Sequence, residues 1–176
     1  DEHAYRNLLL VEQPNGDFAF TMARQLLYAA FLAPYFTALS ASIDARLAEI
    51  GAKAAKEMVY HLRHAAEWVI RLGDGTEESR ARMVAALDEL WMYTGEMFEM
   101  DAGETALSAQ GIAVDRGSLR PVWEATLARV LAEATLARPA DRWMQRGGRA
   151  GQHSEHLGHL LAEMQVVHRA HPGASW

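Results

Sequence analysis

A long amphipathic stretch over residues 43–72 constrains this chain more than any other feature. Its apolar side chains recur every three or four positions, at the period of about 100° per residue that is typical of an α-helix. They are Ile43, Leu47, Ile50, Ala54, Met58, Ala65, Trp68 and Leu72. A helix of this length has to pack its apolar stripe against other helices, so the chain is expected to fold as an all-α bundle.

Three ionisable residues lie on or beside the same stripe: Glu57, His61 and His64. His61 lies in its middle, with Glu57 one turn before it and His64 one turn after it, within about 60° of the stripe. Burying an unpaired charge is costly, so each side chain would need a partner in the core. We expect a buried hydrogen bond between Glu57 and His61, with His64 nearby. A metal ion or another functional role for the three side chains is the alternative.

The same periodicity predicts four more long helices and one short helix. The long helices are expected over residues 18–40, 76–98, 118–138 and 153–171, and the short one over 104–109. The expected N-caps are Asp17, Ser42 or Asp44, Thr76 and Ser118. Pro34 should kink or break the first helix, whereas Pro121 is tolerated in a first turn. No convincing strand or internal repeat is found.

Composition and charge argue against several classes of function. The net charge is −6 and the pI is about 5.7, which disfavours a nucleic-acid or anionic-membrane partner, because both need a concentrated basic face. The absence of cysteine removes disulfides, thiolate metal sites and cysteine nucleophiles. With no apolar run approaching about 18 residues and no basic-then-apolar leader, a cytoplasmic protein is expected.

A helical bundle with inward acids and imidazoles raises the possibility of a carboxylate-bridged di-iron site. That site needs a Glu-x-x-His pair on each of two helices and a glutamate on each of the other two. The residue three positions after Glu57 is Tyr60, not histidine. No Asp or Glu occurs between Asp17 and Asp44. An intact di-iron site is therefore not favoured, and the alternative is a self-sufficient di-metal oxidase or metal-storage bundle that uses Glu57 and the two histidines.

A basic, glycine-rich loop, RGGRAGQHSEH, precedes the last helix. Arg146 and Arg149 flank its two glycines, where backbone amides and the helix dipole both favour an anion. These arginines are weak candidates for an anion site, and a plain loop, exposed or docked on a partner, is the alternative. In the helix itself, Glu155 and His159 fall opposite the apolar face and are expected to be solvated.

Four segments of the chain closely resemble one family. They are NLLLVEQPNGDFAFTMARQ, AKEMVYHLRHAAEWVIRLGDGTEES, GIAVD and GGRAGQHSEHLGHLLAEMQ. Over essentially its whole length the chain resembles the PaaC-type subunit of the bacterial ring-1,2-phenylacetyl-CoA epoxidase. The resemblance implies a ferritin-like helical fold and a structural, non-catalytic subunit of a multicomponent monooxygenase in aerobic phenylacetate catabolism.

In that family the di-iron centre and the acyl-CoA site belong to a partner catalytic subunit, which the PaaC-type subunit resembles in fold. The resemblance therefore implies no catalytic, cofactor-binding or metal-binding residue here, and Glu57, His61 and His64 would be the degenerate remnant of a di-iron site. The expected partners are the catalytic subunit, other subunits and the reductase, in a hetero-oligomer, or a homodimer in isolation. A contribution of Arg146 and Arg149 to binding the CoA phosphates is a weaker hypothesis.

One departure from the family concerns extent. The family has a further helical segment upstream, so residues 1–176 are expected to form a single ferritin-like domain that is incomplete at its N-terminus. Without that segment, the apolar face of helix 18–40 should be partly uncovered unless another chain fills it.

Overall fold

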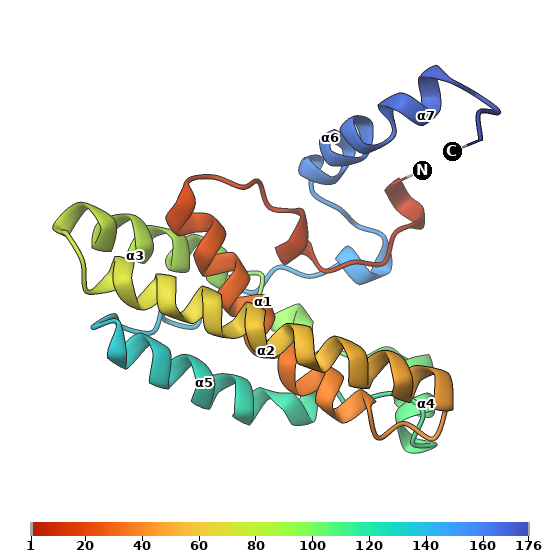
Figure 1. Ribbon diagram of the computed structural model, residues 1–176, viewed down its shortest axis with the longest axis horizontal. Coiled ribbons are helices and arrows are strands. Elements are labelled where there is room, and N and C mark those ends of the chain that lie inside the picture. Colours follow the sequence, from red (N-terminus) through yellow and green to blue (C-terminus); the bar gives the residue numbers. More distant parts are fainter. Residues whose placement is uncertain (1, 176) are drawn as a thin grey trace.

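The computed structural model describes residues 2–175, and all its regular elements in that range are helices, which confirms the predicted all-α, ferritin-like bundle (Figure 1). The α-helices are α1 (Phe18–Leu39), α2 (Ala45–Gly73), α3 (Glu77–Trp91), α4 (Ala102–Ala109), α5 (Arg120–Glu133), α6 (Glu155–Met164) and α7 (Val166–Ala170). Short 3₁₀ turns lie at η1 (Glu2–Ala4), η2 (Leu9–Glu12), η3 (Gly95–Phe98), η4 (Gly117–Leu119) and η5 (Gly148–Ala150).

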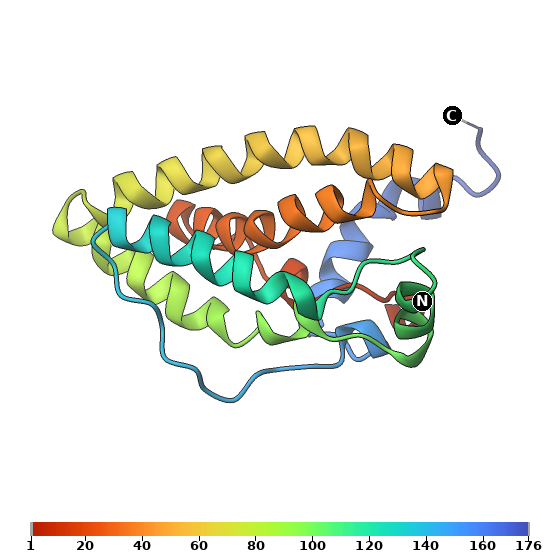
Figure 2. The same ribbon diagram turned by 90° about the horizontal axis from the view of Figure 1, so that it is seen from below.

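Helix α1 lies at the centre of the bundle. It packs mainly on α2 and also contacts α3 and α5, and Figure 2 shows these four helices running alongside one another. The inward side of its middle turns is fully buried as a result, with Leu26 and Leu27 at 0% exposure. Removing apolar surface from water in this way contributes roughly 25 cal/mol per Å² and is the main source of stability in such a bundle.

Side-chain caps fix where three of the helices begin, as predicted. The caps are Asp17 for α1, Asp44 for α2 and Thr76 for α3, and each accepts a hydrogen bond from a backbone amide two or three positions further on. Such a cap contributes about 1 kcal/mol. Ser42, the alternative cap for α2, instead donates its hydroxyl proton to the carbonyl of Ile112.

Several helix ends differ from the prediction. Helix α1 is not broken at Pro34 and continues to Leu39. The third helix ends at Trp91 and is followed by the separate η3 turn, so it does not run to residue 98. The last helix, expected over residues 153–171, is divided at Gln165 into α6 and α7. Periodicity carries no information about such local interruptions of a continuous apolar pattern.

Helix α5 is shorter than predicted at both ends. Ser118 does not cap it, because its hydroxyl donates to a carbonyl three residues upstream, and the helix begins at Arg120. At its other end the helix stops at Glu133, and Thr135 takes a left-handed φ of 57°, which ends a helical path. Arg80 of α3 donates to the carbonyl and hydroxyl of Thr135 and holds this turn in place.

The buried face of α2 is displaced by about one position from the predicted stripe. Its fully buried residues are Gly51, Ala65, Ala66, Val69 and Gly73. Ile43 and Ile50, which were predicted to be buried, are 73% and 55% exposed. Small residues on the buried face let α1 and α2 approach closely, because a Cβ on Gly51 would lie only 2.6 Å from the Ser40 amide nitrogen. The prediction is therefore right for the helix and for four of the stripe residues, and wrong for Ile43 and Ile50. The four are Leu47, Ala65, Trp68 and Leu72, which are buried or pack against the core.

Helix α1 also leaves apolar surface uncovered. Phe18 is 49% exposed, and Tyr28, Leu32 and Tyr35 are only half-buried. Apolar surface of this kind is usually covered by another protein segment or a ligand.

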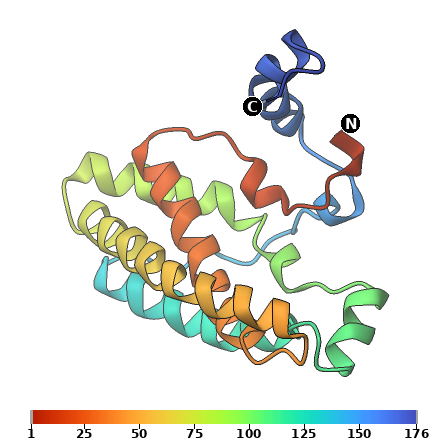
Figure 3. The same cartoon turned by 45° about the vertical axis from the view of Figure 1, so that its right-hand side comes forward.

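The two ends of the described chain form a terminal lobe, defined here as residues 2–16 and 147–175. Helix α6 contacts the η1 and η2 turns, and Figure 3 shows this pairing set to one side of the long helices. No helix within residues 2–175 is long and apolar enough to cross a membrane.

Candidate functional site

The three ionisable residues of the predicted α2 stripe are exposed. Glu57, His61 and His64 all face away from the core. The two imidazoles make ring contacts with Tyr60, at centroid distances of 5.9 and 6.1 Å. The expected buried hydrogen bond between Glu57 and His61 is therefore wrong. The displacement of the α2 face explains this, because the residues that follow each of the three in sequence take the more inward positions.

These residues do not fit a di-iron centre. Within residues 2–175, no group of three or more His, Asp or Glu side chains is placed to hold a metal ion. Helix α1, the main neighbour of α2, contains no acidic residue and so offers no bridging carboxylate. Glu155 and His159 are exposed on α6, as predicted.

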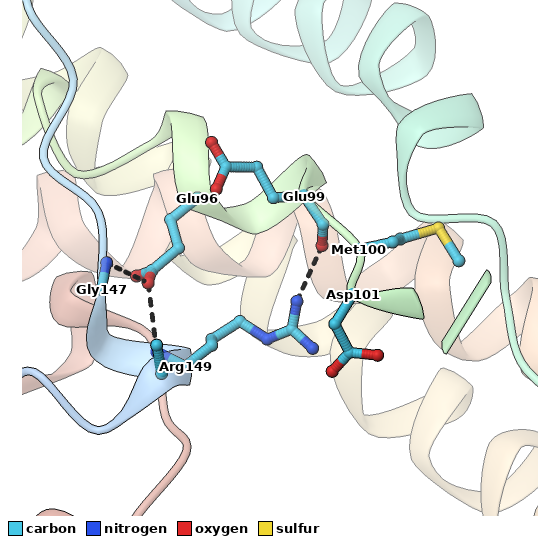
Figure 4. Close-up of a pocket in the computed structure, with 7 residues that line it drawn as sticks. Glu96, Glu99, Met100, Asp101, Gly147 and Arg149 are labelled. Carbon is cyan, nitrogen blue, oxygen red and sulfur yellow. Dashed lines mark hydrogen bonds between the residues drawn. The ribbon is translucent and has the colours of Figure 1, made fainter. Parts of the chain in front are cut away.

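The glycine-rich loop binds a carboxylate of the chain itself. Glu96 on η3 is 2% exposed, and it accepts hydrogen bonds from the amides of Gly147 and Arg149, both at 3.1 Å (Figure 4). Its second oxygen accepts from the Leu9 amide at 3.0 Å. Gly147 has a φ of 120°, which favours glycine. Converging amides of this kind form an anion-binding nest, and here the anion is internal.

The two arginines of the loop also pair with acidic residues of the chain. Arg146 contacts the Glu99 carboxylate at 2.9 Å. Arg149 donates to the Glu99 carbonyl at 2.7 Å and pairs with the Glu104 carboxylate. Arg116 contacts the same Glu104 oxygen at 3.5 Å. Two guanidinium groups therefore share one carboxylate. Arg149 also lines a cavity of about 190 Å³ (Figure 4).

Burial and charge shift the pKa values of this cluster. Burial acts to raise the pKa of Glu104, but the hydrogen bonds from Arg149 and the Asp101 amide, with the charges of Arg149 and Arg116, outweigh burial and lower that pKa. Burial lowers the pKa of Arg116, and the charge of Arg149 lowers it further, while Glu104 acts in the opposite sense. A further anion beside Arg116 would raise the pKa of Arg116, against the lowering by burial and by the charge of Arg149.

A second buried carboxylate joins the two ends of the chain. The side chains of Glu12 and His153 are 0% and 3% exposed, and His153 Nδ1 lies 2.6 Å from a Glu12 oxygen. The other Glu12 oxygen accepts from the amide and the hydroxyl of Ser154, both at 2.8 Å. Sequence analysis missed this cluster, because no periodicity or local motif connects residues so far apart. Its role is to hold the start of α6 against the η2 turn.

Fold and site together define a class: a ferritin-like helical protein whose buried carboxylates hold its own segments in place. The family model described as phenylacetic acid catabolic protein matches residues 1–176. The chain is also 49% identical over 176 residues to the Escherichia coli K12 protein named as the C subunit of 1,2-phenylacetyl-CoA epoxidase, with 100% of this chain and 71% of that protein covered. This chain therefore belongs to the phenylacetic acid catabolic protein family, as its four characteristic segments predict.

Proposed function

We propose that this chain is the structural, non-catalytic subunit of a phenylacetyl-CoA 1,2-epoxidase, a multicomponent monooxygenase of aerobic phenylacetate catabolism. The observation that carries this proposal is the 49% identity, over the whole chain, to a protein named as one subunit of that epoxidase. In this proposal the chain works in the cytoplasm, binds no cofactor itself and scaffolds the subunit that holds the di-iron centre.

The arrangement on α2 supports a non-catalytic role. A di-metal bundle site needs carboxylates that converge from several helices onto one enclosed point. Glu57, His61 and His64 are exposed on a single helix, and α1 beside them carries no acid. The chain's well-buried carboxylates, Glu12 and Glu96, are already saturated by donors from its own loops.

The same face of α2 supports a role in assembly. Ile50 is 55% exposed and shares this side of the helix with Glu57, His61 and His64. Ile43, which is 73% exposed, lies just before the N-cap Asp44. We call these five residues the α2 face. Exposed apolar groups beside polar ones are typical of the surface that a partner protein covers. In this proposal the α2 face is covered by the catalytic subunit.

Co-elution with the catalytic subunit tests the scaffold role. The two proteins are expected to run as one complex in gel filtration. Ile50→Asp is expected to weaken the complex by at least about tenfold, or about 1.4 kcal/mol. Val59→Asp is a matched control, because Val59 is 65% exposed on the opposite side of the same helix. Separate elution of the two folded wild-type proteins would contradict the proposal.

Metal analysis tests the non-catalytic part of the proposal. When both proteins are purified from iron-supplemented cells, the iron is expected with the catalytic subunit and not with this chain. About two irons per chain, lost in Glu57→Ala, would instead indicate a self-sufficient di-metal oxidase or storage protein.

A further inference from the structure

A groove of about 300 Å³ lies between the last turns of α3 and the irregular segment 139–143. Its apolar surface comes from Trp91 and Pro139, which are buried, and from Met92, which is half-buried. It includes no residue of α1, of α2 or of the N-terminal segment. Figure 2 shows segment 139–143 on the side of the bundle away from α2. The groove is therefore separate from the uncovered side of α1 and from the α2 face.

An exposed tryptophan lines this groove. Trp143 is 70% exposed, more than any other Trp, Tyr or Phe among residues 2–175. A tryptophan side chain can bury roughly 150–250 Å² of surface, and leaving most of it in water forgoes the free energy of that burial. Tryptophan and arginine are the residues that most often carry the binding energy of protein–protein interfaces, and Arg142 lines the groove beside Trp143. These features are typical of a surface that another protein covers.

Negative charge is left over on the α3 side of the groove. Asp88 and Glu89 both line it and are both exposed. Among residues 2–175, neither side chain makes a hydrogen bond or an ion pair. Two carboxylates are therefore available to positive groups outside the chain.

Positive charge is left over on the other side. Arg142 also lines an adjoining cavity of about 660 Å³, together with Arg120 and Arg146. The two carboxylates of that cavity already have partners, because Glu99 pairs with Arg146 and Asp141 pairs within its own segment. Within residues 2–175, the side chains of Arg120 and Arg142 make no hydrogen bond or ion pair. Two guanidinium groups on this side thus match, in number, the two free carboxylates on the α3 side.

This distribution of charge is complementary to itself. A two-fold axis beside Trp143 would bring the acidic side of one copy against the basic side of the other, and the same contact would occur twice. The two Trp143 rings would pack together at the centre, where burial removes both from water. A partner of a single charge sign would match one side of the groove and be repelled by the other. The surface therefore fits a second copy of this chain better than a uniformly acidic or basic protein.

We propose that the groove joins two copies of this chain in a closed two-fold dimer, with Trp143 at its centre. Arg120 and Arg142 of each copy lie against Asp88 and Glu89 of the other copy. The dimer leaves the α2 face free and does not depend on the scaffold role proposed above. With one apolar anchor and exposed charge pairs, its Kd is expected at about 10–100 µM. At about 1 µM, where unfolding is measured, the chain is then a monomer and Trp143 stays a surface residue.

Sedimentation equilibrium of the full chain, from about 1 to about 200 µM, tests this proposal. The mean mass is expected to rise from that of one chain toward that of two and no further, because a two-fold contact closes on itself. The association should weaken at about 1 M salt, which screens the charge pairs. A chain that stays monomeric at the highest concentration, or that grows beyond two copies, overturns the proposal.

Two charge reversals test the pairing itself. Arg142→Glu and Glu89→Arg should each weaken self-association by at least about tenfold, because like charges then face each other. An equimolar mixture of the two variants should dimerise about as tightly as the wild type, since each variant supplies the charge that the other needs. Arg129→Glu is the matched control, because Arg129 is 65% exposed on α5 and lies outside both cavities. Failure of the mixture to associate refutes the pairing.

A third variant tests the apolar centre. Trp143→Ala should weaken the dimer by at least about tenfold, because it removes the ring that both copies bury. Melting curves by circular dichroism establish that each variant is folded, which is expected at exposed positions. A dimer that persists in Trp143→Ala and in both charge reversals uses another surface, such as the uncovered side of α1, and overturns this assignment.

Discussion

The helical bundle and the terminal lobe are held together by different kinds of contact. In the bundle, α1 is enclosed by apolar side chains from α2, α3 and α5. The terminal lobe is held by two buried carboxylates, Glu12 within it and Glu96 on the adjoining η3 turn, which accept hydrogen bonds from several groups of its loops. Apolar burial is non-directional and is shared among many residues, whereas a buried carboxylate leaves several donors unsatisfied when it is lost. Substitutions in the bundle core should therefore lower the stability of the whole fold, whereas loss of a buried carboxylate should loosen the terminal lobe locally.

Truncating the bundle core is expected to have the largest effect. Trp123 is 1% exposed, and its indole donates to the Leu27 carbonyl at 2.9 Å. Trp123→Ala should lower the free energy of unfolding by about 3–5 kcal/mol in urea denaturation, because it leaves a cavity. Trp143→Ala is the control, since Trp143 is 70% exposed, and it should change stability by less than about 0.5 kcal/mol. Similar losses in both variants would contradict this account of the core.

Removing Glu96 should loosen the terminal lobe while the bundle stays folded. Glu96→Ala leaves the amides of Leu9, Gly147 and Arg149 without their acceptor, at a cost of about 3 kcal/mol. Hydrogen exchange should become faster at these three amides and stay slow in the middle of α1. Glu99→Ala is the control, because the Glu99 carboxylate pairs with an exposed arginine, Arg146, and not with a backbone amide of the loop. Equal acceleration throughout α1 would show that the two regions unfold as one unit.

Removing the imidazole of His153 should release α6 with a smaller effect. His153→Phe deletes one of the donors to the buried Glu12 carboxylate, and the loss of that hydrogen bond costs about 2 kcal/mol. Limited proteolysis should then cut between the η5 turn and α6 sooner than in the wild type. His159→Phe, at an exposed position of α6, should leave the cleavage rate unchanged. No difference between the two variants would mean that the lobe is held by other contacts.

The smallest expected effect is a pH dependence at Glu104. Because its pKa is lowered in the folded chain, its contribution is fully present above the unfolded carboxyl value of about 4.3 and is lost as pH falls through the folded value. The Glu104 side chain is 26% exposed, so solvent screening limits the contribution to about 1 kcal/mol or less. Glu104→Gln should flatten the stability profile below about pH 4.3. A profile with the wild-type slope would contradict the assigned shift.

Local signals predicted much of the bundle. Asp17, Asp44 and Thr76 cap their helices through contacts within three residues, so sequence alone was sufficient there. The inward face of α2 was not predictable in the same way, because close contact with α1 at Gly51 decides it. The apolar periodicity of one helix does not determine which of two adjacent faces packs against a neighbouring helix.

Long-range polar contacts were out of reach for a related reason. Glu12 and His153 are paired across most of the chain, and the sequence around each gives no sign of the other. The glycine-rich loop was recognised as suited to an anion, but its partner Glu96 lies in a segment expected to continue the third helix. The resemblance of four segments predicted the family, which the comparison with known proteins confirmed.

The absent side chain at Gly51 affects more than the two helices that meet there. The backbones of α1 and α2 are so close at this point that a methyl group would collide with the Leu39 carbonyl carbon at 2.8 Å. This contact restrains α2 from rolling about its own axis, so in the assembly proposed above Ile50 would meet the catalytic subunit at one set angle. A residue that touches no companion would thus govern how the complex is oriented.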